Sequence, residues 1–385
     1  MASARTNLNH LFDNHTRGFQ KRVDVLSLHV CTRPLSIRSE PLAVTSFFHY
    51  TEIIGTSTLV FVKGGRLVPN IWAHIQFGKE VLRSIKASEH LELQEWKIAF
   101  QLGCQGPDFL FYDHYLPWKT STPLNKLGTM MHSANCGPFL ISMFEAVGER
   151  PLHDPATAYT IGFLLHHVLD RHLHPFVFSR SGFKKWHHQR YETAMDSVIL
   201  MRRAGIHTGQ TPVAPEIDTG GKLPGGFAPD FLRIVSRNYP VLGEIISAER
   251  LDQAVAQMIQ AQKLFFDPSG WKSRFAFGQL SPFSPPRRMP DWDVLNDSRA
   301  EWIDPTDRTV IRRESAMELW DRALEDGQAT TAAGIRWLIA SANGEHEEAA
   351  RLKIRFSGLL GDVSYETGLP CGSASIVYAD SVVPA

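Results

Sequence analysis

Cysteine is scarce in this sequence of 385 residues. The four cysteines, Cys31, Cys104, Cys136 and Cys371, are widely separated and include no CxxC pair. This low density excludes a disulfide-framework protein and favours a reducing compartment. Cys371 stands alone in the turn-like segment TGLPCG, where a single cysteine is more often inert than catalytic.

An excess of positive charge is also missing. Lysine plus arginine and aspartate plus glutamate each number 40, so the formal net charge is zero. A nucleic-acid-binding protein normally carries a broad basic field, and none is expected here. A local groove of aromatic and basic side chains could still hold a single strand.

Long apolar runs are lacking as well. The most hydrophobic stretch, residues 42–62, is interrupted by His49 and Glu52 and therefore lacks the character of a membrane span. It also begins too far into the chain, without a small-residue cleavage site, to be an ordinary signal peptide. We therefore expect a cytoplasmic protein.

Residues 1–67 differ from the rest of the chain because they show no sustained helical period, and the segment KGGRLVPN (63–70) spans the boundary where the helical pattern begins. One hypothesis places the true start at Val68, since Lys-Gly-Gly codons can spell a ribosome-binding sequence and a valine codon can start translation in bacteria. The alternative is a poorly ordered or strand-rich extension. Mass spectrometry of the native N-terminus separates the two, and a native peptide from within 1–60 would contradict the Val68 start.

After residue 68 the hydrophobic pattern is mostly helical, and strand-like runs are scarce. Helices are expected over residues 69–86, 94–103 and 137–150, from 155 to about 174, and from about 183 to 201. Asp154 and Pro155 form a good N-cap and first position for the fourth helix, and Pro175 marks its end. The sequence thus divides into an N-terminal extension (1–67), a metal-binding helical core (68–204) and a helical C-terminal part (205–385) with Gly/Pro-rich linkers.

Histidine is the residue type in excess, with 17 in the chain, most of them within residues 74–188. The densest stretch is HHVLDRHLH at 166–174. On the expected helix, His166, Asp170 and His174 occupy positions i, i+4 and i+8 of an otherwise apolar face. Burying these groups is unfavourable unless a divalent metal compensates, and imidazole and carboxylate at one-turn spacing are metal ligands.

The next helix offers a second pair of ligands. His188 and Glu192 are again separated by one turn, and Asp196 lies one turn further as a possible supporting acceptor. Such a pair alone is a weak signal, because polar side chains at this spacing are common on exposed helices. His167 and His172 lie off the ligand face of their helix and are interpreted as surface or supporting groups.

Three further candidates lie upstream. His74 is on the apolar face of its helix, Asp108 follows a tight Gly-Pro turn, and His132 stands in GTMMHSAN between a loop and a helix. Singly, each would more often be an ordinary core or turn residue. Together with the two helices above, they favour one metal centre in the core of a helical bundle.

The ordered segments PNIWAHIQFG, QLGCQGPDFLFY, MMH, GFLLHHVLDRHLHPF and HxxxE resemble the zinc-dependent phospholipase C family of bacteria. The likeness covers residues 68–200, and the later stretches WDVLNDSRAEWIDP and SYETGLP resemble the unexported branch of that family. The resemblance implies an all-α fold, a multi-helix phospholipase C/P1 nuclease-like bundle around a metal cluster, with a helical C-terminal extension.

The resemblance also implies two or three zinc ions with the following ligands. One ion is surrounded by Asp108, His132, His166 and Asp170, a second by His174, His188 and Glu192, and a third by His74 with the bridging Asp170. Secreted members complete the third site with the amino group of an N-terminal tryptophan. Trp72 is internal here, so the third ion lacks that ligand.

The expected activity is hydrolysis of a phosphate ester, above all a diester, by a metal-bound hydroxide. Asp108 would be both a ligand and the acceptor of a proton. The expected substrate is a small phosphate ester or a phospholipid head group, and no membrane-docking β-sandwich is expected in residues 200–385. The alternatives are a non-catalytic, zinc-stabilised helical protein that binds a partner and a P1-like nuclease. A histidine-aspartate phosphohydrolase is disfavoured, because the adjacent pair His153-Asp154 has the character of a helix cap.

Overall fold

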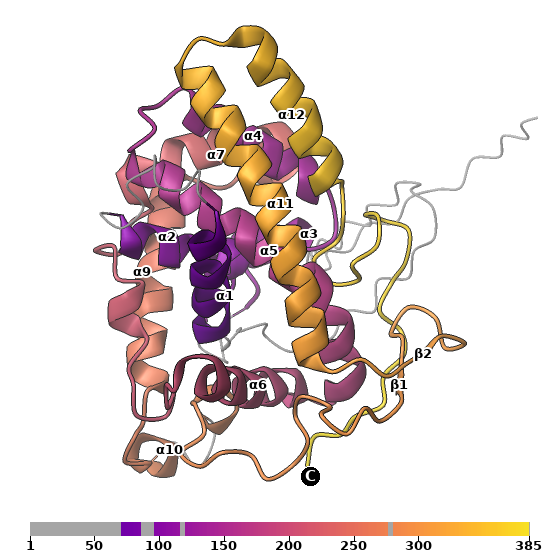
Figure 1. Cartoon of the computed structure of the whole chain (residues 1–385). Helices are drawn as coiled ribbons and strands as arrows, with labels where there is room; N and C mark the ends of the chain where they lie inside the picture. The colour runs from indigo at the N-terminus through magenta and orange to yellow at the C-terminus, as the bar shows by residue number, and fades with distance from the viewer. Residues whose placement is uncertain (1–70, 86–95, 116–119, 276–279, 385) are drawn as a thin grey trace, which may run out of the picture. The chain divides into compact units, whose positions relative to one another are not determined.

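The computed structural model describes residues 71–85, 96–115, 120–275 and 280–384 (Figure 1). Every described residue belongs to one compact unit, Ser57–Ala385. The proposed start at Val68 and the extension before it lie outside the described residues. None of the described helices combines the length and the hydropathy that a membrane span requires.

The described part of the chain is mostly helical and has very little strand, which confirms the prediction of an all-α fold. The α-helices are α1 (Ile71–Ser84), α2 (Lys97–Gly103), α3 (Pro123–Met131), α4 (Cys136–Gly148), α5 (Pro155–Ser181), α6 (His187–Ala204), α7 (Ala228–Asn238), α8 (Pro240–Gly243), α9 (Ala248–Phe265), α10 (Trp271–Phe275), α11 (Ala316–Ala342) and α12 (His346–Leu360). Short 3-10 helices are η2 (Gly106–Tyr112), η3 (Ala214–Glu216), η4 (Pro224–Gly226) and η5 (Ser281–Phe283). The strands β1 (Trp302–Ile303) and β2 (Ile311–Arg312) form one antiparallel pair.

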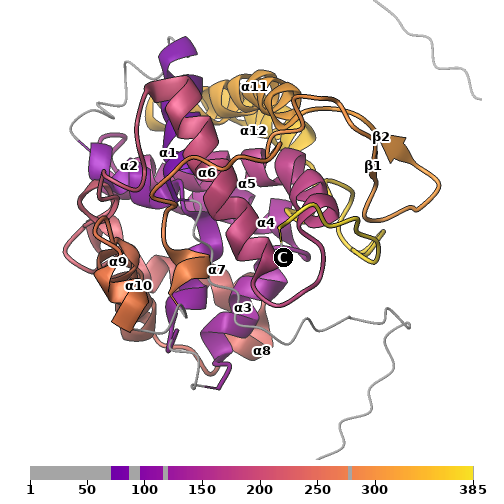
Figure 2. The same cartoon turned by 90° about the horizontal axis from the view of Figure 1, so that it is seen from below.

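Helix α5 is the central element of the bundle. It packs against α1, α2, α4, α6 and α11, and almost all of its side chains are buried. Its start agrees with the prediction, since the side chain of Asp154 accepts a hydrogen bond of 2.7 Å from the backbone N–H of Ala156 and Pro155 occupies the first helical position. Viewed from below, α6 lies against α5 and α1 (Figure 2).

The predicted end of this helix, before Pro175, is wrong. Helix α5 continues through Pro175 to Ser181. A proline inside a helix removes one N–H donor, here the one that would bond to the carbonyl of Arg171. Gly368 packs directly on that carbonyl, where a Cβ would lie only 2.4 Å from the oxygen. The buried side chains of Phe176 and Val177 add apolar contacts that favour continuation of the helix.

Two glycines allow α2 to touch α5. A Cβ on Gly162 would lie 2.3 Å from the carbonyl oxygen of Phe100, and one on Gly103 would lie 2.1 Å from that of Tyr159. Both distances are shorter than any van der Waals contact, so only glycine fits at either position. This close approach brings the segment after α2, including Asp108, to the face of α5 that carries His166.

The replacement of Gly162 by alanine is therefore expected to destabilise the fold by about 3 kcal/mol, because backbone atoms of α2 must move away. Gly358 in α12 provides a matched control, since it is exposed and nothing lies within 4 Å of its added Cβ. Its change to alanine is expected to be neutral or stabilising by up to about 1 kcal/mol. Urea denaturation measures both, and equal effects of the two substitutions would contradict the close-packing argument.

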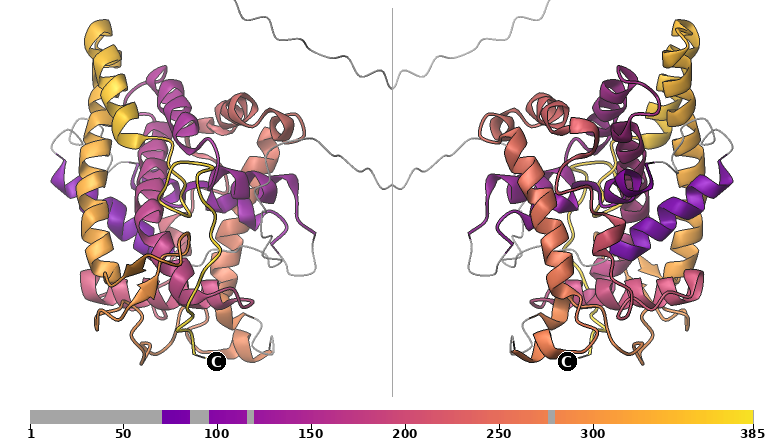
Figure 3. Two further views of the ribbon diagram at one scale, coloured as in Figure 1. Left: turned by 90° about the vertical axis from the view of Figure 1, so that its right-hand side faces the viewer. Right: turned by 90° about the vertical axis from the view of Figure 1, so that its left-hand side faces the viewer.

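The C-terminal part of the chain contributes to the same core. Helices α11 and α12 lie side by side (Figure 3), and α11 also packs against α5 and α1. After α12 the chain returns without regular structure toward the central helix, where the carbonyl oxygen of Val363 lies 2.8 Å from Nε2 of His167. Residues far apart in sequence therefore surround α5.

Candidate metal centre

All the predicted ligands converge at one place in the bundle. His74 comes from α1, Asp108 from η2, His132 from the C-terminal end of α3, His166, Asp170 and His174 from α5, and His188 and Glu192 from α6. Each of these side chains is buried, apart from His188, which is half-buried. They form a continuous series in which imidazoles alternate with carboxylates.

Asp108 lies at one end of the series. Its Oδ1 atom is 3.2 Å from Nε2 of His132, and its Oδ2 atom is 3.8 Å from Nε2 of His166. The other nitrogen of each ring faces a backbone carbonyl, that of Gly128 at 2.6 Å for His132 and that of Cys104 at 3.1 Å for His166. These carbonyls fix the ring orientations and leave both Nε2 atoms directed at the carboxylate.

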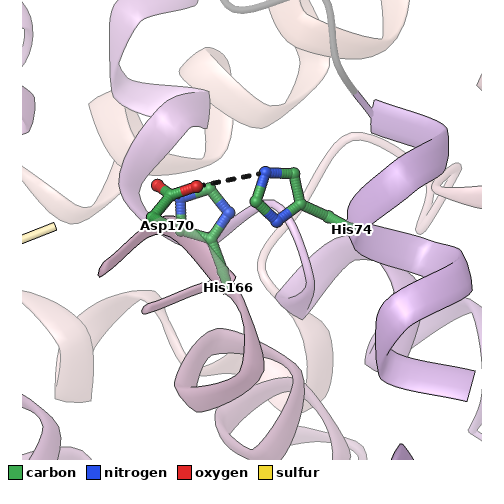
Figure 4. A group of neighbouring side chains, drawn as sticks. All are labelled: His74, His166 and Asp170. Carbon is green, nitrogen blue, oxygen red and sulfur yellow. Dashed lines mark ion pairs between the residues drawn. The ribbon is translucent and has the colours of Figure 1, made fainter. Parts of the chain in front are cut away.

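Asp170 is the centre of the series. Its Oδ2 atom lies 3.0 Å from Nε2 of His166, and its Oδ1 atom lies 3.4 Å from the Nε2 atoms of both His74 and His174. Figure 4 shows His74 and His166 on the same side of this carboxylate, with their rings stacked at a centroid distance of 4.2 Å. One carboxylate thus contacts three imidazoles, as expected of a bridging ligand.

Glu192 lies at the other end. Its Oε1 atom is 3.1 Å from Nε2 of His188 and 3.7 Å from Nε2 of His174. The side chain is only 1% exposed. Neither of its oxygens has a hydrogen-bond partner among the described residues. A buried carboxylate without such a partner is unfavourable unless a cation compensates.

Other buried donor and acceptor atoms of the series also lack hydrogen bonds among the described residues. Oδ1 of Asp108, Nε2 of His166 and Oδ2 of Asp170 are also buried without a hydrogen bond among the described residues. Orphaned polar atoms are rare in protein interiors, and here they are nitrogen and carboxylate oxygen atoms directed at one another. Imidazole nitrogen and carboxylate oxygen are the donors that zinc prefers in catalytic sites. These residues therefore fit a bound zinc ion.

Electrostatics in the cluster differ from one histidine to the next. Burial, assisted by His166, lowers the pKa of His74 well below its usual value, which keeps that ring in the neutral form that binds metals. Burial also acts to lower the pKa of His166, but the carboxylates of Asp170 and Asp108 outweigh it and raise that pKa to about 9. A divalent cation would compete with this proton for the same Nε2 atom.

Asp196 binds the backbone of α1 and not the side chain of a candidate ligand. Its Oδ1 atom accepts a hydrogen bond of 2.5 Å from the backbone N–H of Ala73, in the first turn of α1. Burial raises the pKa of Asp196 to about 8, against the lowering effect of this bond. The carboxylate anchors the start of α1 to α6 and thereby positions His74.

The two other histidines of the HHVLDRHLH stretch point away from the cluster. His167 is fully buried, and burial followed by the charge of Arg171 lowers its pKa to about 3. His172 is half-buried and lies 2.8 Å from Oδ2 of Asp326, which also binds Arg171. Both therefore hold the C-terminal part of the chain against α5.

Tyr365 is a residue that the sequence patterns did not identify. Its backbone N–H donates to the carbonyl of His132 at 2.9 Å, and its ring lies 5.0 Å from that of His132 and 5.8 Å from that of His166, measured between centroids. It belongs to the SYETGLP segment, for which the sequence indicates only a resemblance to the family. Tyr365 forms part of the wall beside the Asp108 end of the cluster.

Neither a curated protein nor a solved structure matched the chain. Residues 73–239 match the family model described as zinc-dependent phospholipase C. This range extends from the first turn of α1 to the residue after α7 and contains every predicted metal ligand. Residues 73–239 therefore form a domain of the zinc-dependent phospholipase C type.

Proposed function

We propose that this protein is a zinc-dependent hydrolase that cleaves phosphodiester bonds in substrates of the phospholipid head-group type. The observation that carries the proposal is the buried series of alternating imidazoles and carboxylates, several of whose donor atoms have no hydrogen bond among the described residues. The family supports both the metal and the class of reaction.

Within this series, two groups of side chains have ligand atoms within 4.8 Å of one another, and His166 belongs to both. The first group is Asp108, His132 and His166, and the second is His74, His166 and Asp170. His174, His188 and Glu192 extend the series beyond Asp170. We infer at least two zinc ions, one at the Asp108 end and one at the Glu192 end, with Asp170 between them. His74 with Asp170 provides ligands for a third.

Zinc bound here would supply positive charge to the phosphate oxygens and lower the pKa of water. The protein side chains would accept the proton and keep the ligands aligned. Asp108 would accept the proton from the attacking water, because one of its oxygens lacks a hydrogen bond and the carboxylate lies between two imidazoles. The carbonyls behind His132 and His166 would keep those rings aligned during the reaction.

The replacement of Asp108 by asparagine tests this role. The change keeps the size of the side chain and one oxygen donor but removes the proton acceptor. We expect kcat for a chromogenic phosphocholine diester to fall by about 100-fold or more, with zinc still bound at the Glu192 end. Asp297→Asn is the matched control, because Asp297 is exposed and pairs with Arg202 at the surface.

The measurement combines zinc content by elemental analysis with steady-state hydrolysis. A zinc-loaded wild-type protein that hydrolyses no phosphate monoester, diester or single-stranded nucleic acid would contradict the proposed enzyme. If the wild-type protein is active and Asp108→Asn keeps full kcat, the role of Asp108 alone would be wrong.

A further inference from the structure

A second cluster of metal-ligating or nucleophilic side chains lies outside the metal centre. Cys136 is the first residue of α4, and Cys371 lies in the segment that follows α12. They are 235 positions apart in sequence, yet their Sγ atoms are 3.4 Å apart. The thiol of Cys371 donates to Sγ of Cys136, and the thiol of Cys136 donates to the carbonyl of Met131 at 3.3 Å.

The surrounding backbone holds the two cysteines together. Gly137 packs directly on Gly361, since an added Cβ would lie 2.0 Å from the carbonyl oxygen of Gly361. Asp362 makes two further connections. Its Oδ1 atom accepts from the N–H of Gly137 at 3.1 Å, and its carbonyl accepts from the N–H of Cys371 at 2.9 Å. The contact between the thiols is therefore fixed by the fold and does not depend on two mobile side chains.

The two thiols differ in access. Cys136 is 1% exposed, whereas Cys371 is half-buried, so a reagent in solution reaches Cys371 first. The neighbouring thiol of Cys371, together with burial, raises the pKa of Cys136, which also leaves the first attack to Cys371. Cys104 is buried, and burial raises its pKa as well.

We propose that Cys136 and Cys371 form a redox modification site that a low-molecular-weight disulfide converts into an intramolecular disulfide. The thiolate of Cys371 attacks one sulfur of the reagent, and one reagent thiol leaves. The thiolate of Cys136 then attacks Sγ of Cys371, and the second reagent thiol leaves. Two protein thiols are oxidised to one disulfide, and one reagent disulfide is reduced to two thiols that take up both protons.

Oxidation would join the C-terminal segment covalently to the start of α4, close to the metal centre. Two residues of the C-terminal segment before Cys371 bind the carbonyl of His132. The hydroxyl of Ser364 donates to it at 3.0 Å, and the backbone N–H of Tyr365 also donates to it. The disulfide would thus restrain the backbone of His132, a candidate zinc ligand. Reduction would leave only these hydrogen bonds and packing contacts.

The test uses the full chain in a Cys31→Ser background, so that Cys31, which lies outside the described residues, takes no part. Reduced protein is incubated with oxidised glutathione under native conditions, and intact mass and peptide mapping without reductant follow the products. We expect a loss of two hydrogen atoms, one peptide pair linked through Cys136 and Cys371, and a Tm raised by about 5 °C.

Two single variants give the controls. Cys371→Ser is expected to abolish the reaction, and Cys136→Ser is expected to stop at a mixed disulfide of Cys371 with glutathione. Cys136 is buried, so its replacement by serine could prevent folding. Cys371 is more exposed, so Cys371→Ser still decides the test in that case. Two results would overturn the proposal: thiols that both remain free at equilibrium with oxidised glutathione, or a metal ion held by the two thiolates and Asp362 that blocks oxidation until a chelator removes it.

Discussion

The replacement of His166 by alanine is expected to cause the largest loss of metal and activity of any single change in this protein. Its Nε2 atom lies 3.0 Å from Asp170 and 3.8 Å from Asp108, so the imidazole belongs to both groups of ligands. Its removal would leave two buried carboxylates with one ligand fewer between them, and like charges at short range disfavour each other. We expect zinc affinity at the Asp108 end to fall by much more than about 100-fold and phosphodiester hydrolysis to become undetectable.

The measurement is zinc stoichiometry by elemental analysis, beside kcat/KM for the same diester. His172→Ala is the matched control, because His172 is on the same helix but faces Asp326. It is expected to keep its zinc and its activity. His166→Gln, which retains a polar side chain of similar size, separates the loss of a ligand from the loss of volume. A folded His166→Ala protein with the full complement of zinc would show that the ion binds elsewhere.

The candidate ligands on the helices could be identified from sequence because they follow a helical period. His166, Asp170 and His174 share a face whose other members are apolar, and the structure confirms that this face is buried. His188 and Glu192 follow the same rule on α6. Spacing within one helix is local information, and the sequence contains all of it.

The grouping of ligands from different helices could not be read from a pattern. Asp108 meets His166 because α2 packs on α5 through two glycines, and His74 is positioned through the bond from Asp196 to the start of α1. The sequence pattern assigns no role to Gly162, and it indicates Asp196 only as a supporting acceptor one turn after Glu192. Their effects depend on contacts between segments that are distant in sequence. The residue patterns favour one shared metal centre, but only the resemblance implies which residues surround which ion.

Contacts made by the C-terminal part were even less accessible to a reading of local sequence patterns. Nothing in the pattern of SYETGLP indicated that Tyr365 would pack on two candidate ligands, or that Cys371 would meet Cys136. The end of α5 was predicted wrongly for a related reason. A proline ends an isolated helix, but here the carbonyl that it leaves without a donor is covered by Gly368, which is far along the chain.

Removal of zinc from the wild-type protein is expected to lower its stability as well as its activity. The cluster places three carboxylates and several imidazoles in the core, and without a cation their orphaned atoms lose the compensation that makes burial tolerable. A ligand present at about 1,000 times its Kd stabilises a fold by about 4 kcal/mol. Chelation should therefore lower Tm by about 10 °C.

Differential scanning calorimetry before and after chelation measures this effect, and re-addition of metal identifies its cause. Zinc is expected to restore both Tm and hydrolysis. Magnesium should restore neither, because it prefers six oxygen ligands and the cluster is rich in imidazole nitrogen.

An unchanged Tm after complete chelation would contradict a metal role for the buried series. A fall in Tm that zinc reverses, without hydrolysis of any phosphate ester, would instead favour a structural zinc centre in a protein whose helical C-terminal part binds a partner. Stability and turnover measured on the same samples thus separate the existence of the metal centre from its catalytic use.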